Sequence, residues 1–160
     1  MLKTRCIFVV LTVLAVTADP AGAKPRLGGT ERAVISHVNA IRSDNGLAPV
    51  RAASSLNRAA DAHSADMLRN DFFAHESSDG TSFDARIRRY DRAGTLGENI
   101  AALSDASNRA ATVVRMWMES PGHRAIILTA RFRRVGVAAR TGQLGGDRMT
   151  VVTADFAGRR

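Results

Sequence analysis

Histidine and glutamate side chains are the clearest candidates in this sequence for binding a metal ion or transferring a proton. His75, Glu98, Glu119 and His123 each lie close to a polar turn that borders an apolar segment. Neutral imidazoles and carboxylates are zinc ligands, and histidine changes protonation near neutral pH. Because the four residues are far apart in the sequence, they need not form one site. His75 could be a turn histidine, Glu98 a surface acid and His123 a water-exposed histidine.

A proline fixes the expected position of His123. Proline disfavours the helical conformation at the residue before it and suits the first position of a new helix. We therefore expect one helix to end near Glu119 and another to begin at Pro121, with Ser120 supplying the N-cap oxygen. His123 then lies in the first turn, where the helix dipole disfavours the protonated imidazole. A neutral imidazole can bind a metal ion or accept a proton.

The remaining polar residues give no strong catalytic signature. The sequence contains no HExxH, GxSxG, P-loop or paired CxxC motif. Ser36 and Ser120 have no base and orienting acid at the positions that a triad requires. His63 falls on the apolar side of a predicted helix, where we expect a hydrogen-bonded core residue, and His37 falls on the polar side of another.

The elements that would position these residues are helices first and strands last. Helical spacing of apolar residues predicts helices that begin at Thr30, near Leu56, at Ser82 and at Ser107 or Asn108, the last carrying Trp117 inward. Phe72 to His75 is interpreted as a short extended piece with both phenylalanines in the core. Strands are predicted over residues 135–140 and 149–156, joined by a glycine-rich hairpin turn over 141–146. This order of elements indicates an α+β fold.

The first 23 residues have the pattern of a cleavable secretory signal. Lys3 and Arg5 precede an apolar run over residues 7–16, and small residues at 21–23 fit a cleavage site after Ala23. The run is too short to span a bilayer, so we expect a secreted chain, extracellular or periplasmic, that is not transmembrane after cleavage. Residues 24–29 would be a linker and residues 30–160 a single domain.

The cysteine content and the net charge indicate whether the predicted domain forms disulfides and which kinds of partner it favours. The chain has 160 residues and one cysteine, Cys6, which lies in the expected signal, so the mature protein would form no disulfide. The formal net charge of +8 favours anionic wall polymers, lipid headgroups or nucleic acid without specifying one of them. Arg131, Arg133 and Arg134 form the densest basic cluster, which is also typical of a solvated loop or edge strand.

Five blocks of the sequence together resemble a bacterial domain of the CAP superfamily, also called the SCP-like or pathogenesis-related domain. They occur in the order of that family and cover most of residues 30–157. The blocks are NRAADAHSADML at residues 57–68, FFAH at 72–75, GENI at 97–100, WMESPGHRAIIL at 117–128 and RVGVAAR at 134–140. The resemblance implies an α-β-α sandwich in which a central antiparallel sheet lies between helical layers.

The resemblance also implies a cleft lined by two histidines and acidic residues, which in some members binds zinc or another divalent cation. FFAH places one histidine at His75, GENI places an acid at Glu98 and SPGHR places the second histidine at His123. The second acid of the family falls at Ser120 in this chain, and Glu119 lies one position earlier. Glu98 would either bind the cation or orient a histidine from behind.

These observations lead to three hypotheses for function. The first, which we favour, is a secreted binding or interaction protein, not an enzyme, whose His/Glu cleft recognises a small ligand, lipid or cell-wall component and holds a divalent cation such as zinc. The second is a metal-assisted hydrolase, similar to a peptidase, with Glu98 as general base and the histidines as ligands. The third is a basic protein that coats anionic polymers, and no motif indicates specific recognition of nucleic acid.

Overall fold

The computed structural model describes residues 27–104 and 109–159. The predicted signal at residues 1–23, residues 24–26 of the predicted linker and the predicted helix cap at Ser107 or Asn108 lie outside these ranges. No helix within the described ranges is both long and apolar enough to cross a membrane. The elements, in chain order, are α1 (Gly29–Asp44), β1 (Arg51–Ala52), α2 (Ser54–Arg69), α3 (Phe83–Arg88), β2 (Leu96–Ser104), α4 (Arg109–Glu119), α5 (Pro121–Ile127), β3 (Arg134–Leu144) and β4 (Asp147–Ala157).

The sheet has four strands in the order β1-β3-β4-β2. Strand β4 is antiparallel to both β2 and β3, as the expected sheet requires. Strand β1 differs, because it pairs in parallel with β3 through Arg51 opposite Arg134 and Ala52 opposite Val135. Hydrogen bonds from the N–H groups of Arg51 and Ala53 to carbonyls of β3 and its preceding residue hold this short strand along β3. The sheet is therefore mixed and not purely antiparallel.

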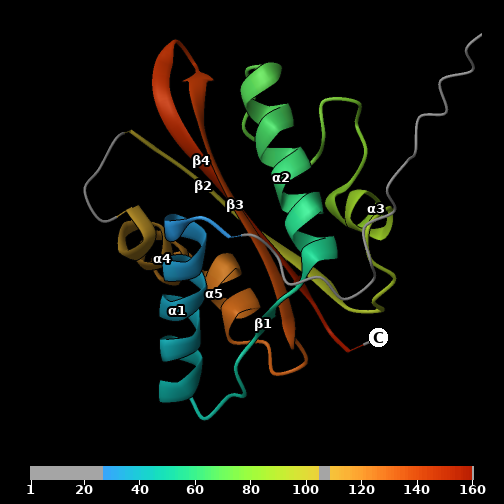
Figure 1. The fold of residues 1–160 in the computed structure, drawn as a ribbon, viewed down its shortest axis with the longest axis vertical. Coiled ribbons are helices and arrows are strands. Elements are labelled where there is room, and N and C mark those ends of the chain that lie inside the picture. Colours follow the sequence, from blue (N-terminus) through green and yellow to red (C-terminus); the bar gives the residue numbers. More distant parts are fainter. Residues whose placement is uncertain (1–26, 105–108, 160) are drawn as a thin grey trace, which may run out of the picture.

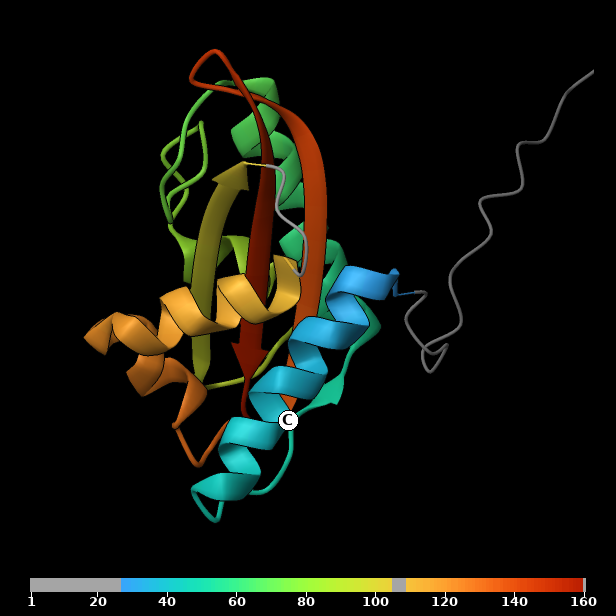
Figure 2. The same cartoon turned by 90° about the vertical axis from the view of Figure 1, so that its left-hand side faces the viewer.

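Helices cover both faces of the sheet (Figures 1 and 2). Side chains of a strand point alternately to opposite faces, and β4 shows this clearly. Val152, Ala154 and Phe156 pack in the core that contains residues of α1, α4 and α5. Val151 packs with Met67 of α2, and Thr153 shares a hydrogen bond of 2.9 Å with Ser64 of α2. The predicted α+β sandwich is confirmed.

The hairpin between β3 and β4 is longer than the sequence predicted. The strands extend over the whole predicted turn region except Gly145 and Gly146, whose φ angles are +61° and +86°. Two consecutive residues with positive φ form the tight turn whose twist matches that of the flanking strands, and glycine adopts this conformation without strain. The glycines thus permit a two-residue connection where a longer loop was expected.

Two predicted core positions are confirmed. Trp117 is 1% exposed in the core beneath α4, and its Nε1 donates a hydrogen bond of 2.9 Å to the carbonyl oxygen of Ile100. His63 is fully buried, and its Nε2 lies 2.9 Å from the carbonyl oxygen of Ala74. Helix α1 begins one residue earlier than predicted, at Gly29, with Gly28 at the N-cap and no side-chain cap.

Candidate functional site

The candidate site lies at β2, which is an edge strand, where the helical layers on the two faces of the sheet approach the same edge. Adjacent residues of β2 serve opposite faces. Glu98 contacts side chains on the α2 and α3 side, including Arg86. Asn99 serves the other side, where its Nδ2 donates a hydrogen bond of 3.1 Å to the carbonyl oxygen of His123 in α5. Neighbouring positions of one strand thus hold parts of both layers.

His75, Glu98 and His123 are brought together at this edge; we call these three side chains the His/Glu site. Nδ1 of His75 lies 2.8 Å from Oε1 of Glu98, although 23 residues separate them in sequence. The rings of His75 and His123 have centroids 5.9 Å apart and are tilted by 50°. The His75 side chain is 45% exposed, whereas that of Glu98 is fully buried. The site therefore has a buried carboxylate behind and imidazole rings in front.

Arg86 of α3 binds the second oxygen of Glu98. Its Nη2 donates to Oε2 of Glu98, and its Nη1 donates to the carbonyl oxygen of His75 at 3.0 Å and to Oγ of Ser77 at 3.1 Å. One guanidinium thus fixes the carboxylate and the backbone of the histidine that the carboxylate holds. Burial opposes the charge of Glu98, but the hydrogen bond with His75 and the charges of Arg86 and His63 outweigh burial and lower the pKa of Glu98.

The backbone that carries His75 is an irregular loop and not the extended piece predicted from the sequence. Asp71 has a φ of +51°, in the left-handed region, which turns the chain out of α2. His63 then holds this loop from below through Ala74. Phe72 packs on the core, but Phe73 is 46% exposed, so the prediction that both phenylalanines are buried is wrong for Phe73. The loop after α2 thus directs one ring to the core and the other to the surface.

His123 is the third residue of α5, as predicted from Pro121. Ser120 occupies the N-cap position but makes no side-chain capping hydrogen bond, so the predicted cap oxygen is not used. Burial lowers the pKa of His123, and the nearby charge of His75 lowers it further. The direction is the one expected from the helix dipole, but the causes are burial and a neighbouring histidine. The neutral imidazole is the form that binds metal.

Glu119 makes its contacts with residues outside the His/Glu site. Its carboxylate accepts a hydrogen bond of 3.1 Å from Arg115 one helical turn earlier, and both side chains are exposed. It lines a different pocket of about 350 Å³ with Met118, Pro121 and Arg124 among its neighbours. Among the described residues, the hydrogen bonds of Glu119 and those of His75 and Glu98 share no partner.

Three buried residues at the site were missed or given only a structural role from the sequence. Arg86 resembles an ordinary surface residue of a short helix, and nothing local indicates its burial. His63 lies 4.0 Å from Glu98, measured from Nε2 to Oε1. Asp155 lies opposite Glu98 in the β2–β4 register, and its pKa is raised by burial and by the charge of Glu98. An acid within the apolar run of β4 was a signal that could have found Asp155.

The residues of the His/Glu site fit a divalent cation that is held only weakly. Two imidazoles that share a zinc ion at about 2.0–2.1 Å have centroids roughly 5 to 6 Å apart, close to the separation of His75 and His123. Both oxygens of Glu98 are already engaged, which leaves this carboxylate to orient His75 and not to bind the ion. Within the described ranges no group of three or more His, Cys, Asp or Glu side chains is arranged to hold a metal.

Comparisons with known proteins agree on one family. The model of the CAP family, described as the cysteine-rich secretory protein family, matches residues 35–156. The uncharacterized protein YkwD of Bacillus subtilis (strain 168) is 34% identical over 122 residues, which are 76% of this chain and 46% of that protein.

Solved structures show the same fold. An extracellular protein with an SCP domain from Bacillus anthracis matches with a TM-score of 0.67 and 26% identity over 82% of this chain and 41% of that one. An outer surface protein of Borrelia burgdorferi matches with a TM-score of 0.71 and 18% identity over 87% of this chain and 99% of that one, a likeness of fold alone. The chain spans less than half the length of the two Bacillus proteins.

Proposed function

We infer the function of this chain from its family: it belongs to the CAP family, the cysteine-rich secretory proteins. We propose that it is a secreted binding protein that recognises its ligand with the imidazole rings of His75 and His123. Two observations support secretion: the signal-like pattern of residues 1–23 and the description of the 26% identical Bacillus anthracis neighbour as an extracellular protein. The ligand class that we propose is a small molecule, lipid or cell-wall component with a group that neutral imidazoles can bind.

The observation that carries this proposal is the chain of contacts from Arg86 through Glu98 to His75. A carboxylate that accepts a hydrogen bond from Nδ1–H of a histidine fixes the tautomer, so that the unprotonated Nε2 is the acceptor left for a ligand. Arg86 binds both Glu98 and the backbone carbonyl of His75, so it fixes the carboxylate and the backbone on either side of the ring. The ring cannot turn without breaking its contact with Glu98. A binding group held in one orientation loses less entropy when a ligand binds.

We further propose that the same rings hold a divalent cation such as zinc, through Nε2 of His75 and a ring nitrogen of His123. Glu98 would act from behind by orienting His75. When bound, such an ion would polarise an oxygen of a ligand or lower the pKa of a water molecule. With two protein ligands the affinity would be modest, since structural zinc sites use four.

The geometry favours binding over hydrolysis with Glu98 as general base. An efficient general base has a pKa close to the working pH and a free oxygen within reach of the substrate. Glu98 is buried, both of its oxygens are engaged and its pKa is lowered. These properties suit a carboxylate that stays ionised and holds a histidine in place.

A calorimetric titration of zinc into the purified protein tests this proposal. We expect one weak site per chain, lost in His75→Ala and in His123→Ala. His37→Ala is the matched control, because His37 is exposed on α1 and any exposed histidine binds zinc to some extent. The absence of zinc binding, or an equal loss of binding in all three variants, would refute the cation site.

A further inference from the structure

A second pocket lies at the end of the sheet where β2 and β3 begin and β4 ends. Its volume is about 510 Å³. The register brings its walls together: Leu96 and Arg134 both lie opposite Ala157, so the residues just outside these three strand ends are neighbours. The N–H of Gly158 donates to the carbonyl oxygen of Thr95 at 2.9 Å, which closes the floor of the pocket.

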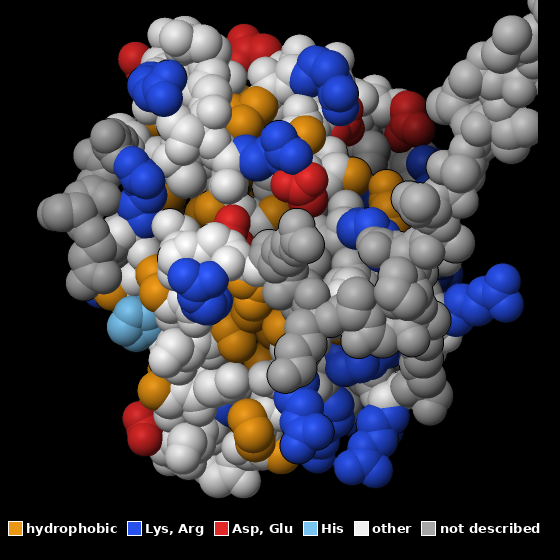
Figure 3. Space-filling view, viewed as in Figure 1, with side chains coloured by type: hydrophobic (Ala, Val, Ile, Leu, Met, Phe, Trp, Pro, Cys, Tyr) orange, Lys and Arg blue, Asp and Glu red, His pale blue; other side chains and the backbone are white. Residues whose placement is uncertain are grey.

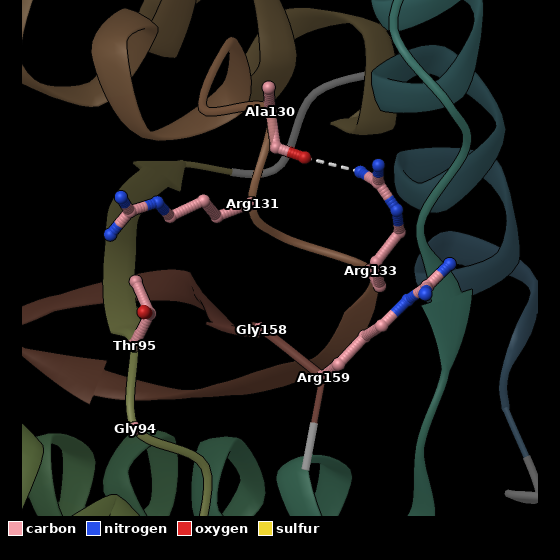
Figure 4. A pocket seen from close by; sticks show the side chains of 7 residues that line it. All are labelled: Gly94, Thr95, Ala130, Arg131, Arg133, Gly158 and Arg159. Carbon is pink, nitrogen blue, oxygen red and sulfur yellow. Dashed lines mark hydrogen bonds between the residues drawn. The ribbon is translucent and has the colours of Figure 1, made fainter.

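Three arginines and no acidic residue are found among the described residues that line this pocket. Figure 4 shows Arg131 extending over Thr95 on one side, and Arg133 and Arg159 on the opposite side, with Gly158 between them. Arg133 donates to the carbonyl oxygens of Ala130 and Phe132. No hydrogen bond or ion pair joins the guanidinium of Arg131 or Arg159 to another described residue. The pocket therefore has cationic groups on two sides whose donors are available to a ligand.

A buried arginine supports the loop that carries two of these side chains. Arg42 of α1 is fully buried and donates to the carbonyl oxygens of Ile127, Thr129 and Phe132. A fourth backbone carbonyl, that of Ala48, accepts from its Nε at 3.0 Å, so within the described ranges its donors meet carbonyls and not a carboxylate. Burial and then the charge of Arg133 lower the pKa of Arg42. The loop is thus rigidly held and lies in a region of excess positive charge.

Arg134, the next residue after Arg133, differs from the arginines of the pocket because it is paired with an acidic residue. Arg134 is bound by Asp91 through both terminal nitrogens and is therefore neutralised. Figure 3 shows Lys and Arg side chains gathered in the lower part of the face, where β1 and the loop before β3 lie in Figure 1.

Guanidinium groups match phosphate oxygens with paired hydrogen bonds, and a phosphate monoester carries about −1.5 to −2 charges at pH 7. A ligand with one phosphate on each side would balance the three arginines.

The pocket is separate from the His/Glu site. Thr95 and Glu98 are three residues apart at the start of β2, which corresponds to about 10 Å along a strand. The apolar side chains of Phe132 and Ile126 lie against Gly97 between them, since a Cβ on Gly97 would be 2.8 Å from Phe132 and 3.3 Å from Ile126. A ligand in one site does not reach the histidines of the other directly.

We propose that the pocket between Arg131 on one side and Arg133 and Arg159 on the other binds a ligand that carries two or more phosphate groups. The arginines supply the charge and paired donors, and the hydroxyl group of Thr95 supplies a further donor. The loop held by Arg42 presents Arg131 and Arg133 without reorganisation, which favours affinity.

Calorimetric titration of tripolyphosphate into the purified protein, at fixed ionic strength, tests this inference. We expect one saturable site, with inorganic phosphate at least tenfold weaker because it reaches the arginines of one side only. The double variant Arg131→Gln with Arg159→Gln should weaken tripolyphosphate at least tenfold. The matched control is Arg69→Gln with Arg148→Gln, which removes the same charge from exposed positions on α2 and β4, and we expect a change of less than twofold.

Further measurements distinguish a loss of binding from a loss of folding, and they identify whether the phosphate belongs to a lipid or to a soluble molecule. Thermal unfolding of both double variants should match that of the parent chain. A third double variant, Arg131→Lys with Arg159→Lys, keeps the charge. It should still weaken the binding of tripolyphosphate severalfold because lysine has no paired donors. Binding to vesicles of cardiolipin, whose lipid headgroup carries two phosphates, would identify lipid headgroups as a source if tripolyphosphate displaces it, and no vesicle binding would identify a soluble one. No binding of tripolyphosphate, or equal loss in the two double variants, would overturn the proposal.

Discussion

The side chains behind His75 form a buried ionic cluster, and its stability depends on the pairing of Arg86 with Glu98. A buried ion pair gives little net stability compared with apolar residues, but removal of one partner leaves an uncompensated buried charge. Arg86→Met would leave Glu98 in this condition. We expect a loss of about 3–5 kcal/mol in the free energy of unfolding, measured by chemical denaturation at pH 7.

Arg69→Met serves as the control for Arg86, because the Arg69 side chain is 69% exposed and its ion pair with Asp66 spans 4.0 Å. Exposed pairs of this kind contribute at most about 1 kcal/mol. If Arg86→Met costs less than about 1 kcal/mol, the Glu98 carboxylate is not both buried and charged. The two results together distinguish a buried charge from a general effect of losing an arginine.

Asp91 should make the stability of the protein depend on pH in the acid range. Burial raises the pKa of Asp91, but hydrogen bonds from Arg134 and Ser55 and the charge of Arg134 outweigh it and lower the pKa to about 2. Relative to an ordinary aspartate at about 3.9, this corresponds to about 2.5 kcal/mol of stability. Because the folded pKa is the lower one, this stability is complete above the ordinary pKa and disappears as the pH falls toward 2.

Denaturation of Asp91→Asn at several pH values measures this contribution. We expect a deficit of at least about 2 kcal/mol at pH 7 that shrinks steadily below pH 4. Asp61→Asn is the control, since the pair of Asp61 with Arg140 is about half exposed, and its deficit should stay below about 1 kcal/mol. A deficit at Asp91 that is independent of pH would mean that packing, and not charge, holds this residue.

At the scale of elements, α4 is attached to the sheet by Trp117. The indole is buried among the core residues shared with α1 and the sheet. Trp117→Ala should cost about 3–5 kcal/mol in the free energy of unfolding, the usual range for removal of a buried large aromatic side chain. Met116→Ala, one residue earlier and 37% exposed, should cost less than about 1 kcal/mol. Equal losses in the two variants would show that α4 packs differently.

Helix α2 lies so close to β3 that a glycine is required between them. A Cβ on Gly136 would overlap the carbonyl carbon of Leu56 and the nitrogen of Asn57, both backbone atoms. Gly136→Ala should therefore destabilise the fold by more than about 3 kcal/mol, above the usual cost of overpacking, because no side chain can move aside. Gly29→Ala, where nothing lies within 4 Å, should be nearly neutral, and thermal unfolding of both variants checks this.

Element type was predictable where local patterns decide it. Apolar spacing predicted α2 and the inward face of α4, and proline predicted the start of α5. The two-residue strand β1 was not predictable, because a pair of residues has no period and its pairing depends on the position of β3. The extended piece expected before His75 was wrong for a similar reason, since Asp71 at the turn accepts a hydrogen bond from the N–H of Gly145 in the distant hairpin.

At the scale of the whole molecule, the site depends on contacts that local sequence patterns do not contain. His75 meets Glu98 across 23 residues, and Arg86 reaches both from a third element. The resemblance of short motifs to a family predicted that the two histidines and Glu98 would be neighbours. It did not predict Arg86 or Asp155, whose surroundings arise only when β2, β4 and α3 pack together.

The central claim is that Glu98 holds His75 through Nδ1 and leaves Nε2 for a ligand, and nitrogen-15 NMR of the imidazole rings tests it most directly. At a pH where the histidines are neutral, we predict a proton on Nδ1 of His75 and none on Nε2. Zinc should then shift Nε2 of His75 and one ring nitrogen of His123, with no comparable shift in His37. A proton on Nε2 of His75, or zinc shifts confined to His37, would contradict this claim.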